Sequence, residues 1–122
     1  PQELIVTSLI RAKFAELLAS SSQLKPQSSE CFLMGLFSLV DAFFDRDKKE
    51  IFQQLPLTDD IKNAILKQQG PYAKLYQFIT AYEKGNWEAV NRLSEELQLP
   101  AEQIAQSYRK AIEWANTFFV HQ

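Results

Sequence analysis

The densest run of apolar residues lies between Cys31 and Phe44, CFLMGLFSLVDAFF, where only Gly35, Ser38 and Asp41 break the apolar pattern. At 100° per residue, the small side chains of a helix over this segment share one narrow stripe, which is made of Cys31, Gly35, Ser38 and Ala42. Larger apolar side chains cover the other faces, and a helix of this kind must be surrounded by other elements. The segment is shorter than the ~20 residues that cross a bilayer. We therefore predict a buried central helix over about residues 30–45, with the small stripe admitting one close neighbour.

Helical spacing of apolar residues continues on both sides of this segment. A first helix is predicted from Leu4 to Ala19, and a last helix begins at Pro100. Between them the pattern predicts four more helices. One runs through Ile51 and Phe52 and ends near Pro56, and the next is capped by Thr58. A third covers Tyr72–Tyr82 and ends at Gly85, and a fourth is capped by Asn86. Ser28 or Ser29 is predicted to cap the central helix. No stretch alternates like a strand, so the predicted fold is a compact all-α bundle of six or seven helices.

Length and composition place these helices in one domain. A chain of 122 residues buries roughly two-thirds of its unfolded surface, which is enough for one core over residues 1–122. The net charge of −2 and the lack of a Lys/Arg cluster argue against nucleic-acid binding. The single cysteine excludes an internal disulfide and suits a reducing cytoplasm, and no signal peptide or membrane span is evident. Because the chain begins with Pro1 and its sole methionine is Met34, we expect a piece of a longer protein.

Residues that often carry catalysis are scarce in this chain. The single histidine, His121, stands one residue from the end, where chains are usually poorly ordered. The chain therefore lacks the second histidine or cysteine that a zinc site needs, and it lacks a well-placed histidine to activate a nucleophile. Cys31 lies among apolar residues, so it is predicted to be a small packing residue whose thiol pKa is raised.

Carboxylates and aromatic rings are the remaining candidates. Asp41 and Asp45 stand one helical turn apart, but a cation site needs more oxygen ligands, so we expect Asp41 to be solvated or paired with Arg11 or Lys13. Six aromatic residues at helical spacing, without basic residues between them, are predicted to be core rather than a base-stacking platform: Tyr72, Tyr76, Phe78, Tyr82, Trp87 and Trp114. Any part of them left exposed is predicted to be a partner-binding patch. The sequence thus predicts no catalytic residue, no cofactor-binding residue and no metal ligand.

Five segments carry a resemblance to a known family: LIRAKFAELLA (Leu9–Ala19), FLMGLFSLVDAFF (Phe32–Phe44), LPLTDDIKNAIL (Leu55–Leu66), AYEKGNWEAV (Ala81–Val90) and YRKAIEWA in the last helix. In this order and spacing they resemble the C-terminal half of the HDOD module of bacterial signalling proteins. The similarity is greatest to the subfamily in which this module follows an EAL-type domain associated with cyclic-di-GMP. The resemblance extends over nearly all of the chain, and it implies an HD-domain-like bundle that is the C-terminal part of a larger module.

The resemblance also bears on catalysis. HDOD modules are related to HD-type phosphohydrolases, whose central helix carries a Gly-Leu-Leu-His-Asp-like segment that supplies metal ligands. The matching segment here is Gly35-Leu36-Phe37-Ser38-Leu39. A serine hydroxyl and an isobutyl group cannot replace a histidine and a carboxylate at a metal-dependent hydrolase site. The resemblance therefore implies a signalling module that is not an enzyme.

Three hypotheses for function follow from the sequence. The first is a non-enzymatic regulatory module of a bacterial signal-transduction protein, linked to a cyclic-di-GMP-type EAL domain. It would bind the upstream domain of the same protein, a partner protein or a second copy in a homodimer. It would not bind nucleic acid, a membrane or a cofactor. The second is a tetratricopeptide-like adaptor for a peptide or protein, because the hairpin between Tyr72 and Ala115 resembles one such repeat, although the 34-residue period occurs once. The third is a degenerate hydrolase or nucleotide-cleaving fragment, for which metal ligands are missing.

Overall fold

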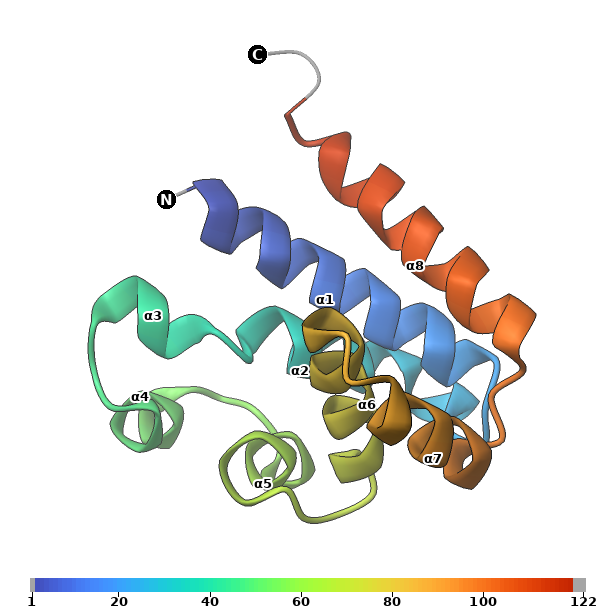
Figure 1. Cartoon of the computed structure of the whole chain (residues 1–122). Coiled ribbons are helices and arrows are strands. Elements are labelled where there is room, and N and C mark those ends of the chain that lie inside the picture. The colour runs from blue at the N-terminus through green and yellow to red at the C-terminus, as the bar shows by residue number, and fades with distance from the viewer. Residues whose placement is uncertain (1, 120–122) are drawn as a thin grey trace.

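The computed structural model describes residues 2–119. Within this range the chain forms eight α-helices and one short 3-10 helix, and it contains no strand (Figure 1). The helices are α1 (Gln2–Ser20), η1 (Lys25–Gln27), α2 (Ser28–Phe37), α3 (Val40–Phe44), α4 (Lys48–Gln54), α5 (Asp59–Lys67), α6 (Ala73–Lys84), α7 (Trp87–Leu97) and α8 (Ala101–Asn116). The all-α prediction is confirmed. The helix predicted over residues 30–45 is divided into α2 and α3, which is why the segments outnumber the predicted helices.

Short polar signals set several helix ends. The side chains of Thr58 and Asn86 each accept a hydrogen bond from a backbone N–H in the first turn of α5 and α7, as predicted. Gly85 ends α6 with a φ of 71°, a left-handed conformation that glycine adopts without strain. The predicted cap of α2 by Ser28 or Ser29 is wrong. The α2 helix follows η1 directly, and the Ser28 hydroxyl donates back to a carbonyl of η1.

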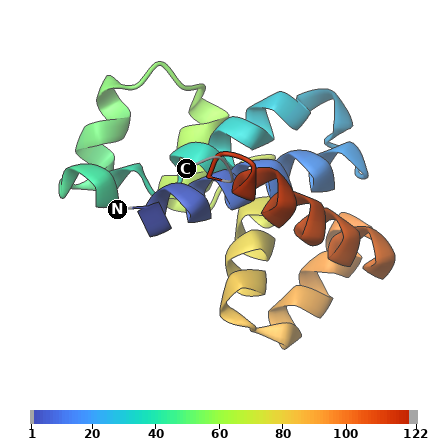
Figure 2. The same ribbon diagram turned by 90° about the horizontal axis from the view of Figure 1, so that it is seen from above.

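The helix around which the others pack is α1. Its most extensive contacts are with α2 and α8, and α6 touches it from a further side (Figures 1 and 2). Its buried apolar residues are Ala12, Phe14, Ala15, Leu18 and Ala19. Small and apolar side chains occur all round this helix, so several neighbours can enclose it. The centre of the bundle is therefore α1 packed against α2, and not the whole segment over residues 30–45.

The contact between α1 and α2 is close because a glycine faces the backbone of α1. A methyl group placed on Gly35 would lie 2.4 Å from the carbonyl oxygen of Arg11 and 2.7 Å from the backbone nitrogen of Ala12. Cys31 and Ser38, which share the predicted small stripe with Gly35, are also buried. The stripe is thus the side of α2 that admits a close neighbour, as the sequence predicts.

The apolar segment is interrupted at Ser38, which lies between α2 and α3. The Ser38 hydroxyl donates to the Gly35 carbonyl at 2.8 Å, and the Ser38 backbone N–H bonds to the same carbonyl at 3.4 Å. Short polar side chains compete with the helix for such carbonyl groups. The α2 helix ends before Ser38, and α3 is a separate helix of five residues. Its last two residues, Phe43 and Phe44, are exposed.

The remaining helices extend from α1 and α2 on different sides (Figure 2). On one side α4 contacts α3 and α5, and α5 contacts α2; on the other, α6 and α7 pack against each other as a hairpin. Glu30, in the first turn of α2, joins these parts because its carboxylate accepts hydrogen bonds from the hydroxyl groups of Thr58 and Tyr72. Among the described residues, none of the helices has the length and apolar character needed to cross a membrane.

Candidate interaction surfaces

Arg11, Ser38 and Glu83 form a polar cluster where α1, the α2–α3 junction and α6 meet. The Arg11 guanidinium donates two hydrogen bonds to the Glu83 carboxylate, each at 2.7 Å, and a third to Ser38 Oγ at 2.9 Å. The two charged side chains are 11% and 24% exposed. Burial alone would lower the pKa of Arg11, but the hydrogen bonds and charge of Glu83 outweigh it, so this pKa is raised. The cluster is a partly buried ion pair that holds three parts of the chain together.

This cluster includes the residue that the resemblance aligns with a hydrolase metal ligand. Ser38 Oγ already bonds to Arg11 and to the Gly35 carbonyl. A guanidinium at 2.9 Å from this oxygen would repel a second cation. Across residues 2–119, no three His, Cys, Asp or Glu side chains are grouped closely enough to hold a metal ion. That the chain has no catalytic, cofactor or metal site stays a prediction.

The two aspartates do not form a site together. Asp41 was predicted to be solvated or paired with Arg11 or Lys13; its side chain is partly exposed and pairs instead with Lys48 of α4 at 3.8 Å. Both of those bases are already paired with glutamates, on α6 and α1 respectively. Asp45 follows α3 as its exposed left-handed cap, with a φ of 50°. The carboxylates of this segment thus serve local ion pairing and chain reversal.

Cys31 and His121 are the two residues that could serve as a nucleophile or a metal ligand, and the structure describes Cys31. Cys31 is fully buried in the core, and burial, assisted by the nearby charge of Glu30, raises its thiol pKa to about 12. The reactive thiolate is therefore scarce near neutral pH. The prediction that Cys31 is a packing residue is confirmed, whereas His121 lies outside the described residues.

An apolar groove opens between the first half of α1 and the α2–α3 segment. We call it the α1–α3 groove; its volume is about 240 Å³, and it is lined by Ile5, Ser8, Leu9, Leu36, Phe37, Val40, Phe43 and Phe44. Phe44 is 61% exposed, and Ile5 and Phe43 are exposed as well. Ser8 is the one polar lining residue; its hydroxyl is buried and has no hydrogen-bond partner within residues 2–119. The groove thus combines exposed apolar walls with one unpaired polar group.

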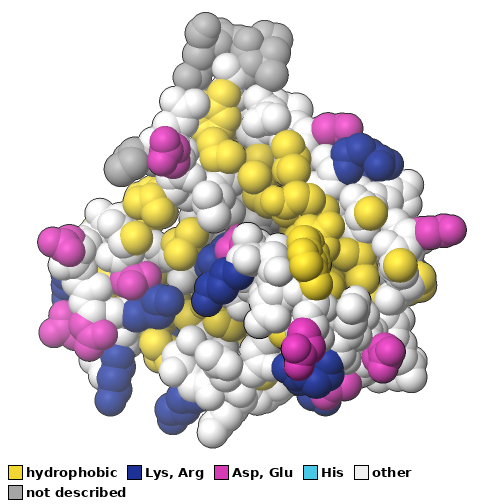
Figure 3. All heavy atoms as spheres, in the orientation of Figure 1, with side chains coloured by type: hydrophobic (Ala, Val, Ile, Leu, Met, Phe, Trp, Pro, Cys, Tyr) yellow, Lys and Arg dark blue, Asp and Glu magenta, His cyan; other side chains and the backbone are white. Residues whose placement is uncertain are grey.

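A second apolar surface lies where α6, α7 and α8 meet α1. Centroid distances of 4.9–5.5 Å connect the rings of Phe14, Tyr82, Trp87 and Tyr108. Figure 3 shows hydrophobic side chains gathered in a band along α8 and α1. Of the aromatic residues predicted to be core, Tyr72 and Phe78 are buried, but Trp87 is 57% exposed. Trp87 is therefore a candidate for partner binding.

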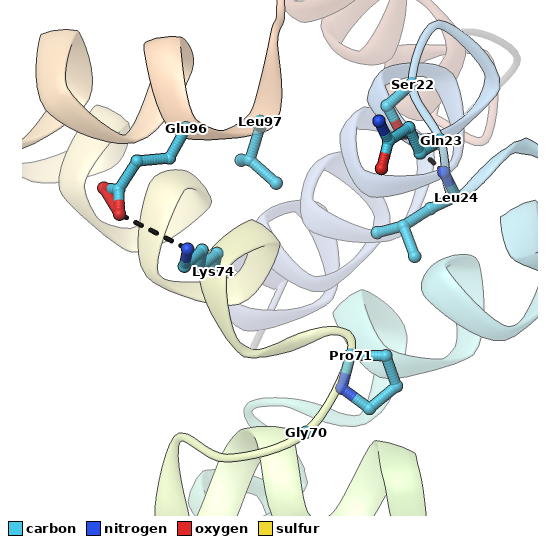
Figure 4. Close-up of a pocket in the computed structure, with 8 residues that line it drawn as sticks. All are labelled: Ser22, Gln23, Leu24, Gly70, Pro71, Lys74, Glu96 and Leu97. Carbon is cyan, nitrogen blue, oxygen red and sulfur yellow. Dashed lines mark hydrogen bonds and ion pairs between the residues drawn. The ribbon is translucent and has the colours of Figure 1, made fainter.

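A third hollow, of about 300 Å³, separates the turn after α1 from the α5–α6 turn and α7 (Figure 4). It is lined by Ser22, Gln23, Leu24, Gly70, Pro71, Lys74, Glu96 and Leu97. Lys74 and Glu96 pair at 3.3 Å, and both remain solvated. Its charged groups are thus already satisfied, and nothing buried in it points to a ligand.

Two curated proteins are similar to this chain. It is 38% identical over 114 residues to the uncharacterized protein YuxH of Bacillus subtilis, and 35% identical over 115 residues to the cyclic di-GMP phosphodiesterase CdgJ of Vibrio cholerae. These alignments cover 93% and 94% of this chain but 27% of each relative. The chain therefore spans about a quarter of the length of the curated relatives it matches. No protein-family profile matches the chain, and no solved structure matches it.

The match makes this chain a homologue of one part of a cyclic di-GMP phosphodiesterase. Most of that relative lies outside the alignment, so the activity in its name does not pass to this chain through the match alone. The chain corresponds to a small separate part of the longer protein.

Sequence reasoning missed two of these features. The Arg11–Glu83 pair joins residues 72 positions apart, and no local pattern signals it. The α1–α3 groove had a weak signal: Phe43 and Phe44 stand directly before the charged run DRDKKE, where a helix leaves the core. The break at Ser38 that exposes them was hidden, because serine also fits a stripe of small residues.

Proposed function

We propose that this chain is a non-enzymatic regulatory and protein-interaction module, the C-terminal part of an HDOD module in a bacterial cyclic-di-GMP signalling protein. In this proposal it lies in the cytoplasm and acts on an EAL-type domain of the same polypeptide. The observation that carries the proposal is the 35% identity to a cyclic di-GMP phosphodiesterase over 94% of this chain and 27% of that relative. A part of that size with its own helical core suits a module that accompanies the catalytic part.

The polar cluster supports the non-enzymatic half of the proposal. The position that the resemblance assigns to a metal-binding histidine is Ser38, and a guanidinium donates to its oxygen. A metal-dependent hydrolase needs an anionic or imidazole donor set around a cation at this point. Here the charges compensate each other within the protein, because Arg11 is neutralised by Glu83.

The exposed apolar residues support the interaction half. Phe44 and Trp87 are more than half exposed, and they lie in two distinct places, the α1–α3 groove and the α6–α7 turn. Exposed apolar patches on a folded domain mark surfaces that bind partners. The upstream domain of the same polypeptide is the partner we propose.

The test compares cyclic di-GMP hydrolysis by three samples: this chain, the remainder of its parental polypeptide, and the two mixed. We expect no hydrolysis above background by this chain with Mg²⁺ or Mn²⁺, and a rate for the remainder that changes several-fold when the chain is added. Hydrolysis by the chain alone that is lost in Asp41→Ala would contradict the proposal. So would a remainder whose rate is the same with and without the chain.

A further inference from the structure

We propose that the α1–α3 groove is the docking site for an amphipathic helix from the remainder of the parental polypeptide. In this complex the Ser8 hydroxyl makes a hydrogen bond to a polar group of the docked helix. The inference rests on the proposed function, because it takes the chain to be the regulatory part of a longer protein. It adds the surface that is used and the kind of segment that covers it.

The buried hydroxyl of Ser8 is the observation that points to a missing partner. Ser8 is 4% exposed, and its Oγ has no hydrogen-bond partner within residues 2–119. Ser20, in the same helix, donates to the carbonyl of Glu16 at 2.9 Å, whereas Ser8 makes no such bond to its own helix. The other residues of the groove are apolar and offer no side-chain acceptor. Buried polar groups in folded proteins are nearly always paired, so a group from outside residues 2–119 is the partner that fits.

The shape of the groove favours a helix over a small molecule. Its volume of about 240 Å³ lies below the range of about 300–1,000 Å³ that is typical of ligand pockets. Its walls are α1 on one side and α2–α3 on the other, and its α1 lining includes Ile5, Ser8 and Leu9, at spacings of three and one. An apolar groove between helices that accepts a few apolar side chains is the kind of surface used in helix-in-groove recognition.

The relatives indicate where the helix comes from. In both of them about three quarters of the length lies outside the segment that matches this chain. A segment joined covalently reaches effective concentrations of about millimolar, which fills even a small groove. A second copy of this chain fits less well through its own α3, because that helix has only five residues and cannot present an apolar ridge of two turns.

The test measures binding of this chain to the separately purified remainder of the parental polypeptide by isothermal titration calorimetry. Phe44→Asp places a charge in the groove. The control is Leu66→Asp, at an exposed apolar residue of α5 that lies outside both apolar surfaces, and Trp87→Asp tests the other candidate surface. We expect Phe44→Asp to weaken binding by about tenfold or more and Leu66→Asp by less than about twofold.

Ser8→Ala supplies a second test, because it should affect the stability of the free chain and the affinity for the remainder differently. Removal of an unpaired buried hydroxyl should leave the melting temperature of the free chain unchanged or raise it, while affinity for the remainder falls by about fivefold. A merely structural serine would not move the two quantities in opposite directions. Equal affinity of Ser8→Ala and wild-type chains would overturn the hydrogen bond that we assign.

The outcomes separate this inference from the proposed function. Binding that is kept in Phe44→Asp and lost in Trp87→Asp would move the interface to the α6–α7 turn and overturn the groove, with the regulatory function intact. Sedimentation velocity could instead show that this chain forms a dimer and that Phe44→Asp dissociates the dimer. The occupant of the groove would then be a second copy, which would also overturn the inference. If the proposed function itself fails, the wild-type chain neither binds the remainder nor changes its hydrolysis rate.

Discussion

The helices α2 and α3 come from one continuous apolar stretch, yet they lie in different environments. In α2, Cys31, Met34 and Gly35 are buried, and Gly35 brings the backbones of α1 and α2 together. In α3 only Val40 is buried, and Phe44 is among the most exposed apolar side chains of residues 2–119. Apolar content does not separate the two helices. The difference is that α2 packs against both α1 and α5, whereas α3 begins after the break at Ser38 and leaves its last two residues exposed.

This contrast divides the stretch by role. The first half stabilises the bundle, because its small residues permit close packing that larger residues would prevent. The second half contributes little to the core and leaves apolar surface available. A single hydrophobic run can therefore supply both a packing face and an exposed apolar face, and its position relative to neighbouring helices decides which.

The largest effect is expected for a substitution that breaks the α2 side of the comparison. Gly35→Leu places a side chain where even a methyl group would lie 2.4 Å from the Arg11 carbonyl. We expect the free energy of unfolding to fall by about 3 kcal/mol or more, as measured by urea denaturation. The control is Ala42→Leu in α3, which belongs to the same small stripe but is exposed; a change within about 0.5 kcal/mol is expected there. Equal losses in both variants would mean that α2 and α3 are packed alike.

The ion pair that fixes the α2–α3 junction is the next site to disrupt. Glu83→Ala leaves Arg11 without its counter-ion, and because both side chains are partly exposed we expect a loss of about 1–2 kcal/mol. Glu50→Ala is the matched control, since the Glu50–Arg46 pair is exposed and should contribute less than about 0.5 kcal/mol. Chemical denaturation of the two variants compares them. Equal stability of Glu83→Ala and wild type would show that Arg11 and Ser38 do not hold the junction.

The dependence of stability on alkaline pH tests whether Cys31, on the buried face of α2, is shielded from water. The thiol pKa rises from an ordinary value of 9.0 to about 12 in the folded protein. The unfolded chain therefore loses its proton first, so this contribution to stability is intact below pH 9 and declines as the pH rises towards 12. Between pH 8 and 10 we expect a loss of about 1 kcal/mol from this group. Thermal unfolding of wild type and Cys31→Ala at both pH values measures it, and an identical pH dependence of the two would contradict the burial of Cys31.

The smallest effect is expected on the α3 side. Phe44→Ser removes a ring that is 61% exposed, so the free energy of unfolding should change by less than about 0.5 kcal/mol. Guanidinium denaturation is sufficient to measure this. A loss above about 2 kcal/mol, which is typical of a buried phenylalanine, would place Phe44 in the core instead.

The sequence predicted features that depend on neighbours in the chain. The caps at Thr58 and Asn86 and the end of α6 at Gly85 follow from local hydrogen bonding and backbone geometry. The small stripe around Gly35 was readable because its helical spacing is regular.

Features that depend on distant parts of the chain were not predictable in this way. The central position of α1 rests on Ala12, Ala15 and Ala19, which are common in exposed helices as well as buried ones. At the break between α2 and α3, the Ser38 hydroxyl donates to a carbonyl of α2 and accepts a hydrogen bond from Arg11, 27 positions away. The α1–α3 groove follows from that break, so it became visible only with the fold.

Hydrogen–deuterium exchange tests the central claim most directly, namely that α2 is sealed against α1 while the groove beside α3 is open until a partner covers it. The measurement compares this chain alone with the chain bound to the remainder of its parental polypeptide. We predict slow exchange of α2 amides in both states, and fast exchange of α3 amides that becomes slow on binding. Exchange in α3 that is as slow as in α2 without a partner, or that does not change on binding, would contradict the account.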